Sequence, residues 1–141
     1  MKKIMLICAV VLLSSIVQAQ DSKTYRIKQS EWYIYNEVSE KWVLQDRMEN
    51  INIDLVAYKN VINIQAKTPT LYRLDRDTKE EIETENLTGY KYVAIECVDM
   101  KKCTVDIFVA KNPEVDIFVF SVIYEDKVAG RVNLRYFGKV Q

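Results

Sequence analysis

Residues 105–119 read VDIFV-AKNPE-VDIFV, an apolar five-residue segment that occurs twice around a turn. In each copy side chains at every second position are apolar, which is the period of a β-strand. Asn112-Pro113 between the copies is a turn signal. The stretch therefore predicts a β-hairpin in which Val105 lies opposite Val119.

The flanking segments extend this hairpin in both directions. Upstream, apolar residues alternate on either side of residues 98–102, and a register with Cys97 opposite Cys103 places them on one face. Downstream, residues 124–127 read as a second turn, which sets Val119 opposite Val132. Four consecutive strands are thus predicted at 90–98, 103–110, 115–124 and 128–137.

The first half of the chain contains further hairpin signals. Residues 37–40 separate two runs that each contain a tryptophan, and Lys59-Asn60 reads as a tight turn between alternating segments. We therefore predict an all-β fold, an antiparallel meander of about 8–9 strands. A small up-and-down barrel is the first expectation and a two-sheet β-sandwich the alternative. The barrel is similar to the lipocalins in topology, although Ser30-Glu31-Trp32 lacks the glycine with which those proteins typically open.

The N-terminal residues indicate export. Lys2 and Lys3 precede the apolar run of residues 4–13, and Val17-Gln18-Ala19 supplies a small-residue cleavage site. The run is too short to span a bilayer, which requires about 20 apolar residues. Residues 1–19 are therefore predicted to be a cleaved signal peptide and 20–141 a single all-β domain, secreted or periplasmic, with no transmembrane segment.

Charge and composition exclude several classes of function. The sequence has 20 Lys and Arg against 20 Asp and Glu, so loss of Lys2 and Lys3 gives 18 − 20 = −2. This balance provides no basic excess for binding nucleic acid. Histidine is absent, which removes the commonest general base and most zinc or copper sites. No catalytic residue, cofactor or transition metal is predicted.

Two of the three cysteines remain after the predicted cleavage. Cys97 and Cys103 are too few for a tetrahedral metal site, and their spacing is not that of a C-x-x-C redox pair. In an oxidising compartment such a pair usually forms a structural bond. The sequence therefore predicts a disulfide between Cys97 and Cys103 that fixes the register of a hairpin.

The most polar segment is the acidic stretch of residues 75–86. It begins like a calcium loop, with Asp75, Asp77 and Glu81 as weak candidate ligands, but it lacks the glycine of an EF-hand turn. A solvated acidic loop is the simpler interpretation. The stretch ends in Asn86-Leu87-Thr88, a glycosylation sequon whose use depends on the source.

Aromatic and arginine residues suggest one candidate contact surface. In the predicted register, the back face of strands 115–124 and 128–137 carries five such side chains, namely Phe118, Phe120, Tyr124, Arg131 and Arg135. Aromatic and arginine side chains are enriched in interface hot spots. The alternative is that the two phenylalanines form a second core, which is the interpretation favoured by the continuous apolar run of their strand.

These observations give three functional hypotheses. The first is a non-enzymatic binding or interaction protein with an unknown protein partner. The second is a carrier of a small hydrophobic ligand in a lipocalin-like barrel cavity. The third and weakest is a carboxylate-dependent hydrolase, for which no two carboxylates stand out. Partner identity and oligomeric state are left open by the sequence.

Overall fold

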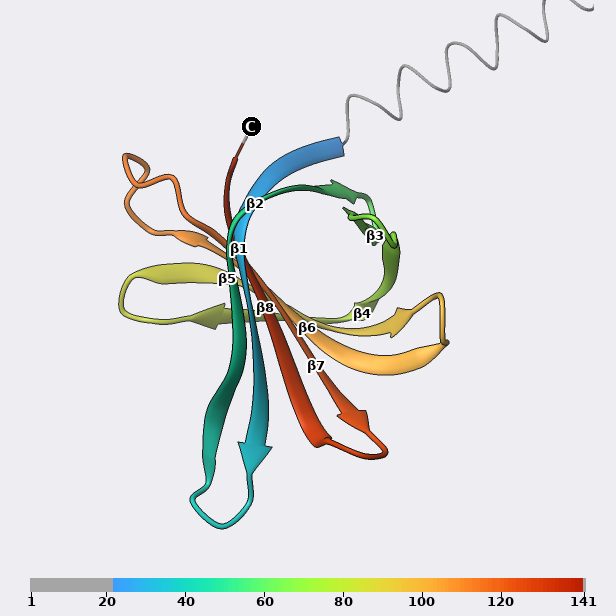
Figure 1. The fold of residues 1–141 in the computed structure, drawn as a ribbon. Helices are drawn as coiled ribbons and strands as arrows, with labels where there is room; N and C mark the ends of the chain where they lie inside the picture. The colour runs from blue at the N-terminus through green and yellow to red at the C-terminus, as the bar shows by residue number, and fades with distance from the viewer. Residues whose placement is uncertain (1–21, 141) are drawn as a thin grey trace, which may run out of the picture.

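The computed structural model describes residues 22–140, which form a closed antiparallel barrel of eight strands in meander order. Figure 1 shows the ring closed by β1 beside β8, with hairpins projecting away from it. The barrel is confirmed in place of the sandwich, and the predicted signal peptide lies outside the described residues. The strands are β1 (Ser22–Asn36), β2 (Lys41–Tyr58), β3 (Val61–Gln65), β4 (Thr70–Glu83), β5 (Leu87–Glu96), β6 (Lys101–Ala110), β7 (Phe118–Asp126) and β8 (Gly130–Val140).

The hairpin turns of the first half lie where the sequence predicts them. Residues 37–40 connect β1 to β2, with the Asn36 side chain accepting hydrogen bonds from the backbone N–H groups of Val38 and Ser39 at 3.0 Å. Lys59 adopts a φ of 49° in the two-residue turn between β2 and β3. Positive φ is the conformation that such two-residue turns require.

The predicted registers of the last three hairpins are wrong, each by an odd number of residues. Cys103 pairs with Ala94, three positions before Cys97. Val105 pairs with Val122 in place of Val119, and Val119 pairs with Phe137 in place of Val132. Successive side chains of a strand point to opposite faces. Each odd shift therefore means that, in one strand of the pair, the side chains predicted to be buried point outward and the others are buried.

The adopted register buries the larger side chains. Phe118 and Phe120 are 1% and 0% exposed inside the barrel, whereas Ile117 is 44% exposed at the outside. The Phe118 ring stacks on Tyr25 of β1 with centroids 3.7 Å apart, and Phe120 meets Tyr72 of β4 edge-to-face at 5.6 Å. Burying two phenylalanines removes more apolar surface from water than burying Ile117 and Val119 would.

The same shift overturns the predicted disulfide. Cys97 and Cys103 are both free, because Cys97 lies in the turn of residues 97–100 and not in the strand opposite Cys103. The Glu96 carboxylate fixes this turn by accepting hydrogen bonds from the backbone N–H groups of Val98 and Asp99, both at 2.8 Å. Side-chain capping of this kind is a local preference that favours the shorter loop.

Two glycines allow neighbouring strands to approach each other closely. A Cβ at Gly89 would lie 1.8 Å from the carbonyl oxygen of Ile107, and one at Gly138 would lie 2.3 Å from that of Arg26. Strands approach this closely only where the residue has no side chain.

The acidic segment also differs from the predicted loop, since β4 continues to Glu83. Its irregularity lies between Asp75 and Glu80, where the Thr78 hydroxyl accepts the Val93 N–H at 2.8 Å.

Candidate functional site

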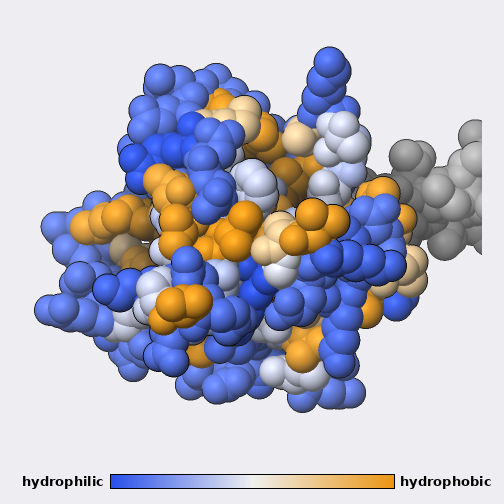
Figure 2. Space-filling model, turned by 60° about the horizontal axis from the view of Figure 1, so that its bottom comes forward, coloured by the Kyte–Doolittle hydropathy of each residue, from blue (hydrophilic) through white to orange (hydrophobic). Residues whose placement is uncertain are grey.

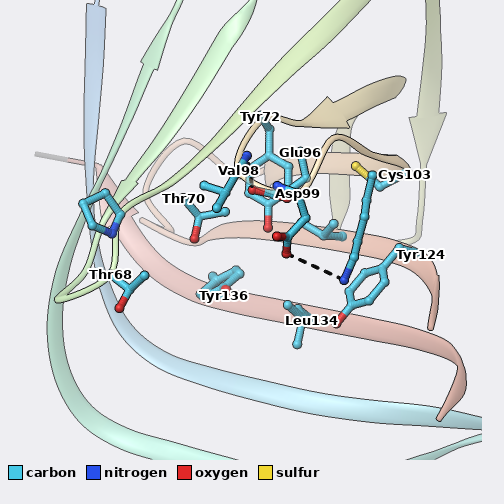
Figure 3. Close-up of a pocket in the computed structure, with 13 residues that line it drawn as sticks. Thr68, Thr70, Tyr72, Glu96, Val98, Asp99, Cys103, Tyr124, Leu134 and Tyr136 are labelled. Carbon is cyan, nitrogen blue, oxygen red and sulfur yellow. Dashed lines mark hydrogen bonds and ion pairs between the residues drawn. The ribbon is translucent and has the colours of Figure 1, made fainter. Parts of the chain in front are cut away.

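A pocket of about 250 Å³ lies at the end of the barrel near the β5–β6 turn. Figure 3 shows its side chains converging from β4 and the β5–β6 turn on one side and from β7 and β8 on the other. The β3–β4 connection forms its edge. The lining residues are Thr68, Pro69, Thr70, Tyr72, Glu96, Val98, Asp99, Lys101, Cys103, Val122, Tyr124, Leu134 and Tyr136.

Three tyrosines, Tyr72, Tyr124 and Tyr136, give the pocket its polar groups. They come from β4, β7 and β8, and the register points them inward because each shares the face of buried Phe120 or Val122. Among residues 22–140, none of the three phenol oxygens is hydrogen-bonded to a protein group. The three oxygens are not among the fully buried atoms without a partner, so they are accessible from the pocket and can bond to a ligand or solvent.

Burial keeps these phenols neutral. It raises the pKa of Tyr72 far above its usual range, and the nearby Tyr136 and Cys103 add to the effect. The pKa of Tyr136 is also raised by burial and by Tyr124. Each hydroxyl therefore retains its proton at physiological pH and can both donate and accept a hydrogen bond.

Charged groups lie at the rim of the pocket. Lys101 Nζ is 3.8 Å from a carboxylate oxygen of Asp99 and 5.6 Å from the centroid of the Tyr124 ring. The Glu96 carboxylate is held by its two hydrogen bonds to the turn. The site is thus an apolar and phenolic interior with two carboxylates and one ammonium group at its opening.

Two of the predicted site residues, Cys103 and Tyr124, line this pocket. Burial, together with the nearby Glu96 carboxylate, raises the pKa of its thiol to about 11. A thiol with such a pKa is almost entirely protonated near neutral pH and is a weak nucleophile. Cys103 therefore contributes packing and a soft contact surface rather than reactivity.

The predicted contact surface is not one surface. Phe118, Phe120 and Tyr124 point into the barrel, whereas Arg131 and Arg135 lie on the outer face, because β7 and β8 pair five residues out of the predicted register. Burial of the two phenylalanines agrees with the alternative that they belong to a core, although the core is the barrel interior. In Figure 2, apolar residues form separate clusters among charged ones on the face shown.

The weak calcium candidates are not brought together. Asp75, Asp77 and Glu81 lie along the irregular part of β4, where Asp75 Oδ1 accepts the backbone N–H of Asp77 at 3.1 Å. Among the described residues, no group of three His, Cys, Asp or Glu side chains has the geometry of a metal site. The side chains of this segment are mostly exposed, as expected for a solvated acidic stretch.

Sequence reasoning missed the pocket residues Tyr72 and Tyr136. Tyr72 alternates with buried Leu74, which is a signal for an inward position, but its meeting with Tyr136 depends on closure of the barrel.

No protein-family model, curated protein or solved structure matches this chain. Within residues 22–140 there is also no helix of the length and apolarity needed to cross a membrane.

Proposed function

We propose that this chain is a non-enzymatic binding protein of the periplasm or cell exterior that holds a small ligand in the mouth of its barrel. The observation that carries the proposal is the set of three phenol hydroxyls, which face one pocket without protein hydrogen-bond partners. Ligand sites are typically apolar cavities with a few convergent polar groups, and this pocket has that composition. The export-type N-terminus supports the location.

The size of the pocket limits its ligand. About 250 Å³ is slightly below the roughly 300–1,000 Å³ of typical ligand pockets. A compact ring-containing molecule with one or two hydroxyl or carbonyl groups suits the flat phenol walls better than a long acyl chain does. The carboxylates at the rim disfavour an anionic ligand, since like charges would be brought together.

The chemistry of the lining argues for binding and not for catalysis. The sequence contains no histidine, and burial raises the pKa values of Tyr72 and Cys103 away from those of a base or nucleophile at neutral pH. A protein partner is the alternative, and on the face that Figure 2 shows apolar residues lie in groups among charged ones.

The proposal is tested by calorimetric titration with 2-naphthol, compared with naphthalene and decanoate. We expect 2-naphthol to bind with the highest affinity, since it alone combines a compact ring system with a hydroxyl. Tyr136→Phe should weaken 2-naphthol binding about threefold to tenfold, because a net hydrogen bond contributes about 0.5–1.5 kcal/mol.

Tyr90→Phe is the matched control, since Tyr90 is 38% exposed and does not line this pocket. It should leave the affinity unchanged. Absence of 2-naphthol binding, or an equal loss of affinity in both variants, would count against a ligand site in the barrel mouth.

A further inference from the structure

A row of polar residues crosses the outer face of the barrel, away from the pocket described above. Each member is the direct pairing partner of the next, so all of them share one face over seven neighbouring strands. In order from β4 through β8 to β1 and β2, the row is Glu80, Lys91, Asp106, Ser121, Arg135, Glu31 and Arg47.

One end of the row is fully satisfied by protein groups. Glu31 is only 7% exposed and accepts hydrogen bonds from Gln29 Nε2 and Arg47 Nε, both at 2.9 Å, and from the Tyr33 hydroxyl. Burial alone would raise the pKa of Glu31, but the hydrogen bonds from Tyr33 and Arg47 lower it. This carboxylate is therefore a structural anion and has no need of a ligand.

The middle of the row differs, because among residues 22–140 neither Asp106 nor Arg135 forms an ion pair at contact distance. Asp106 Oδ1 is buried and receives no hydrogen bond, and burial raises the pKa of this carboxyl, an effect that the nearby charges of Lys91 and Arg135 oppose. The Arg135 guanidinium lies over the Tyr33 ring, 4.6 Å from its centroid, and makes no ion pair within residues 22–140. Ser121 separates the two charges and donates its hydroxyl to Asn133 Oδ1 at 2.7 Å.

These residues line an outer cleft of about 390 Å³. Its floor is polar, and its walls are aromatic and aliphatic side chains from strands on both sides. Trp42 belongs to the β1–β2 hairpin and Leu87 to the β4–β5 hairpin, which diverge from the barrel in Figure 1. The lining residues are Trp42, Leu87, Asp106, Phe108, Val119, Ser121, Ile123, Asn133, Arg135 and Phe137.

Asp106 and Arg135 lie near each other without direct contact. They are two strands apart in the row, which corresponds to about 9.6 Å between their backbones, and the Arg135 charge acts to lower the pKa of Asp106 against the effect of burial. Both side chains line the same cleft, so one ligand that carries an ammonium and a carboxylate group can contact both. An α-amino acid carries these two groups on a single carbon.

We propose that this outer cleft binds a free amino acid with an aromatic or branched apolar side chain. The ammonium group of the ligand lies at Asp106, whose carboxyl can turn either oxygen toward the cleft by rotation about a broad torsion. Its carboxylate lies at the Arg135 guanidinium, a geometry that arginine satisfies with two parallel hydrogen bonds. The apolar side chain of the ligand packs against Trp42 and Phe137.

The experiment uses Trp32→Phe, which leaves Trp42 as the single indole, since the sequence has two tryptophans. L-Phenylalanine is titrated by calorimetry and by Trp42 fluorescence, in parallel with phenethylamine, 3-phenylpropionate and methyl glucoside. We expect the amino acid to bind at least about tenfold more tightly than the amine or the acid alone, because each lacks one charge-assisted contact.

Asp106→Asn and Arg135→Gln should each weaken L-phenylalanine binding by about tenfold or more. Asp77→Asn and Arg76→Gln, at exposed positions of β4, are the matched controls and should have no effect. Circular dichroism checks that the variants are folded, and Arg135→Lys replaces Arg135→Gln if the latter is not. The proposal would be overturned by equal affinity for the amine and the amino acid, or by preference for the glucoside. Unchanged affinity in the Asp106 or Arg135 variant, or no binding in the millimolar range, would also overturn it.

This inference does not depend on the proposed function of the barrel mouth, because the two sites share no lining residue. Tyr136→Phe separates them further, since it should weaken 2-naphthol binding and leave L-phenylalanine binding unchanged. A loss of both ligands in that variant would overturn the assignment of two separate sites.

Discussion

At the scale of single residues, position inside or outside the barrel changes the chemistry of a side chain. Cys103 is a free thiol with a pKa of about 11, whereas Glu31 on the outer face is buried and yet ionised by its three hydrogen bonds. The presence of two free cysteines was not predictable from the sequence, because the predicted export and the predicted strand register both favoured a bond. In the register adopted, the Glu96 carboxylate accepts two hydrogen bonds from the turn that contains Cys97.

Alkylation of Cys103 should be slow at pH 8 and should accelerate about tenfold per pH unit up to about pH 11. The raised pKa leaves about one thiol in a thousand ionised at pH 8, and only the thiolate reacts. Iodoacetamide labelling followed by peptide mapping measures this rate separately from that of Cys97. Recovery of a Cys97–Cys103 disulfide, or rapid labelling of Cys103 at pH 8, would contradict the assignment.

At the scale of strands and turns, the sequence predicts elements better than their relative register. The hairpins around residues 37–40 and Lys59-Asn60 lie as predicted, since their turn residues act locally. The VDIFV repeat was misleading, because its first copy lies within β6 whereas only its last two residues belong to β7. Register there depends on which residues fill the barrel, and that cannot be read from one hairpin.

Gly89→Ala should destabilise the fold more than Gly130→Ala does. A Cβ at Gly89 would clash with the backbone of β6, so strands must separate, and overpacking of this kind typically costs about 1–3 kcal/mol or more. Gly130 has open space around its Cβ position and a φ of 79°, which penalises alanine by about 1–2 kcal/mol. Urea denaturation of the two variants provides the comparison, and equal midpoints would disagree with the close strand approach.

At the scale of the whole molecule, closure creates features that no segment contains. The barrel fold was predictable from the number of sequential hairpins, whereas the pocket of Tyr72, Tyr124 and Tyr136 requires β4, β7 and β8 to meet. The interior is one continuous core, in which Phe120 of β7 contacts Tyr72 of β4. A core shared in this way couples all strands into one cooperative unit.

Phe120→Ala should therefore lower stability by about 3–5 kcal/mol and still give one unfolding transition. Val128→Ala is the control, since Val128 is 97% exposed and its substitution should change stability by less than about 0.5 kcal/mol. Denaturation followed by both tryptophan fluorescence and circular dichroism tests the two expectations together. Separate transitions for the two probes would show that the halves of the barrel unfold independently.

The pairing of Tyr25 with Val140 has a consequence for the order of the strands along the chain. Because β1 starts beside the end of β8, a short linker could join residue 140 to residue 22, and the chain could then be opened at an exposed turn such as that of residues 127–129. Circular permutation of this kind is tolerated where chain ends are close and loop tips are exposed. All eight strand pairings would be kept, so in this barrel the sequence order of the strands is separable from their spatial order.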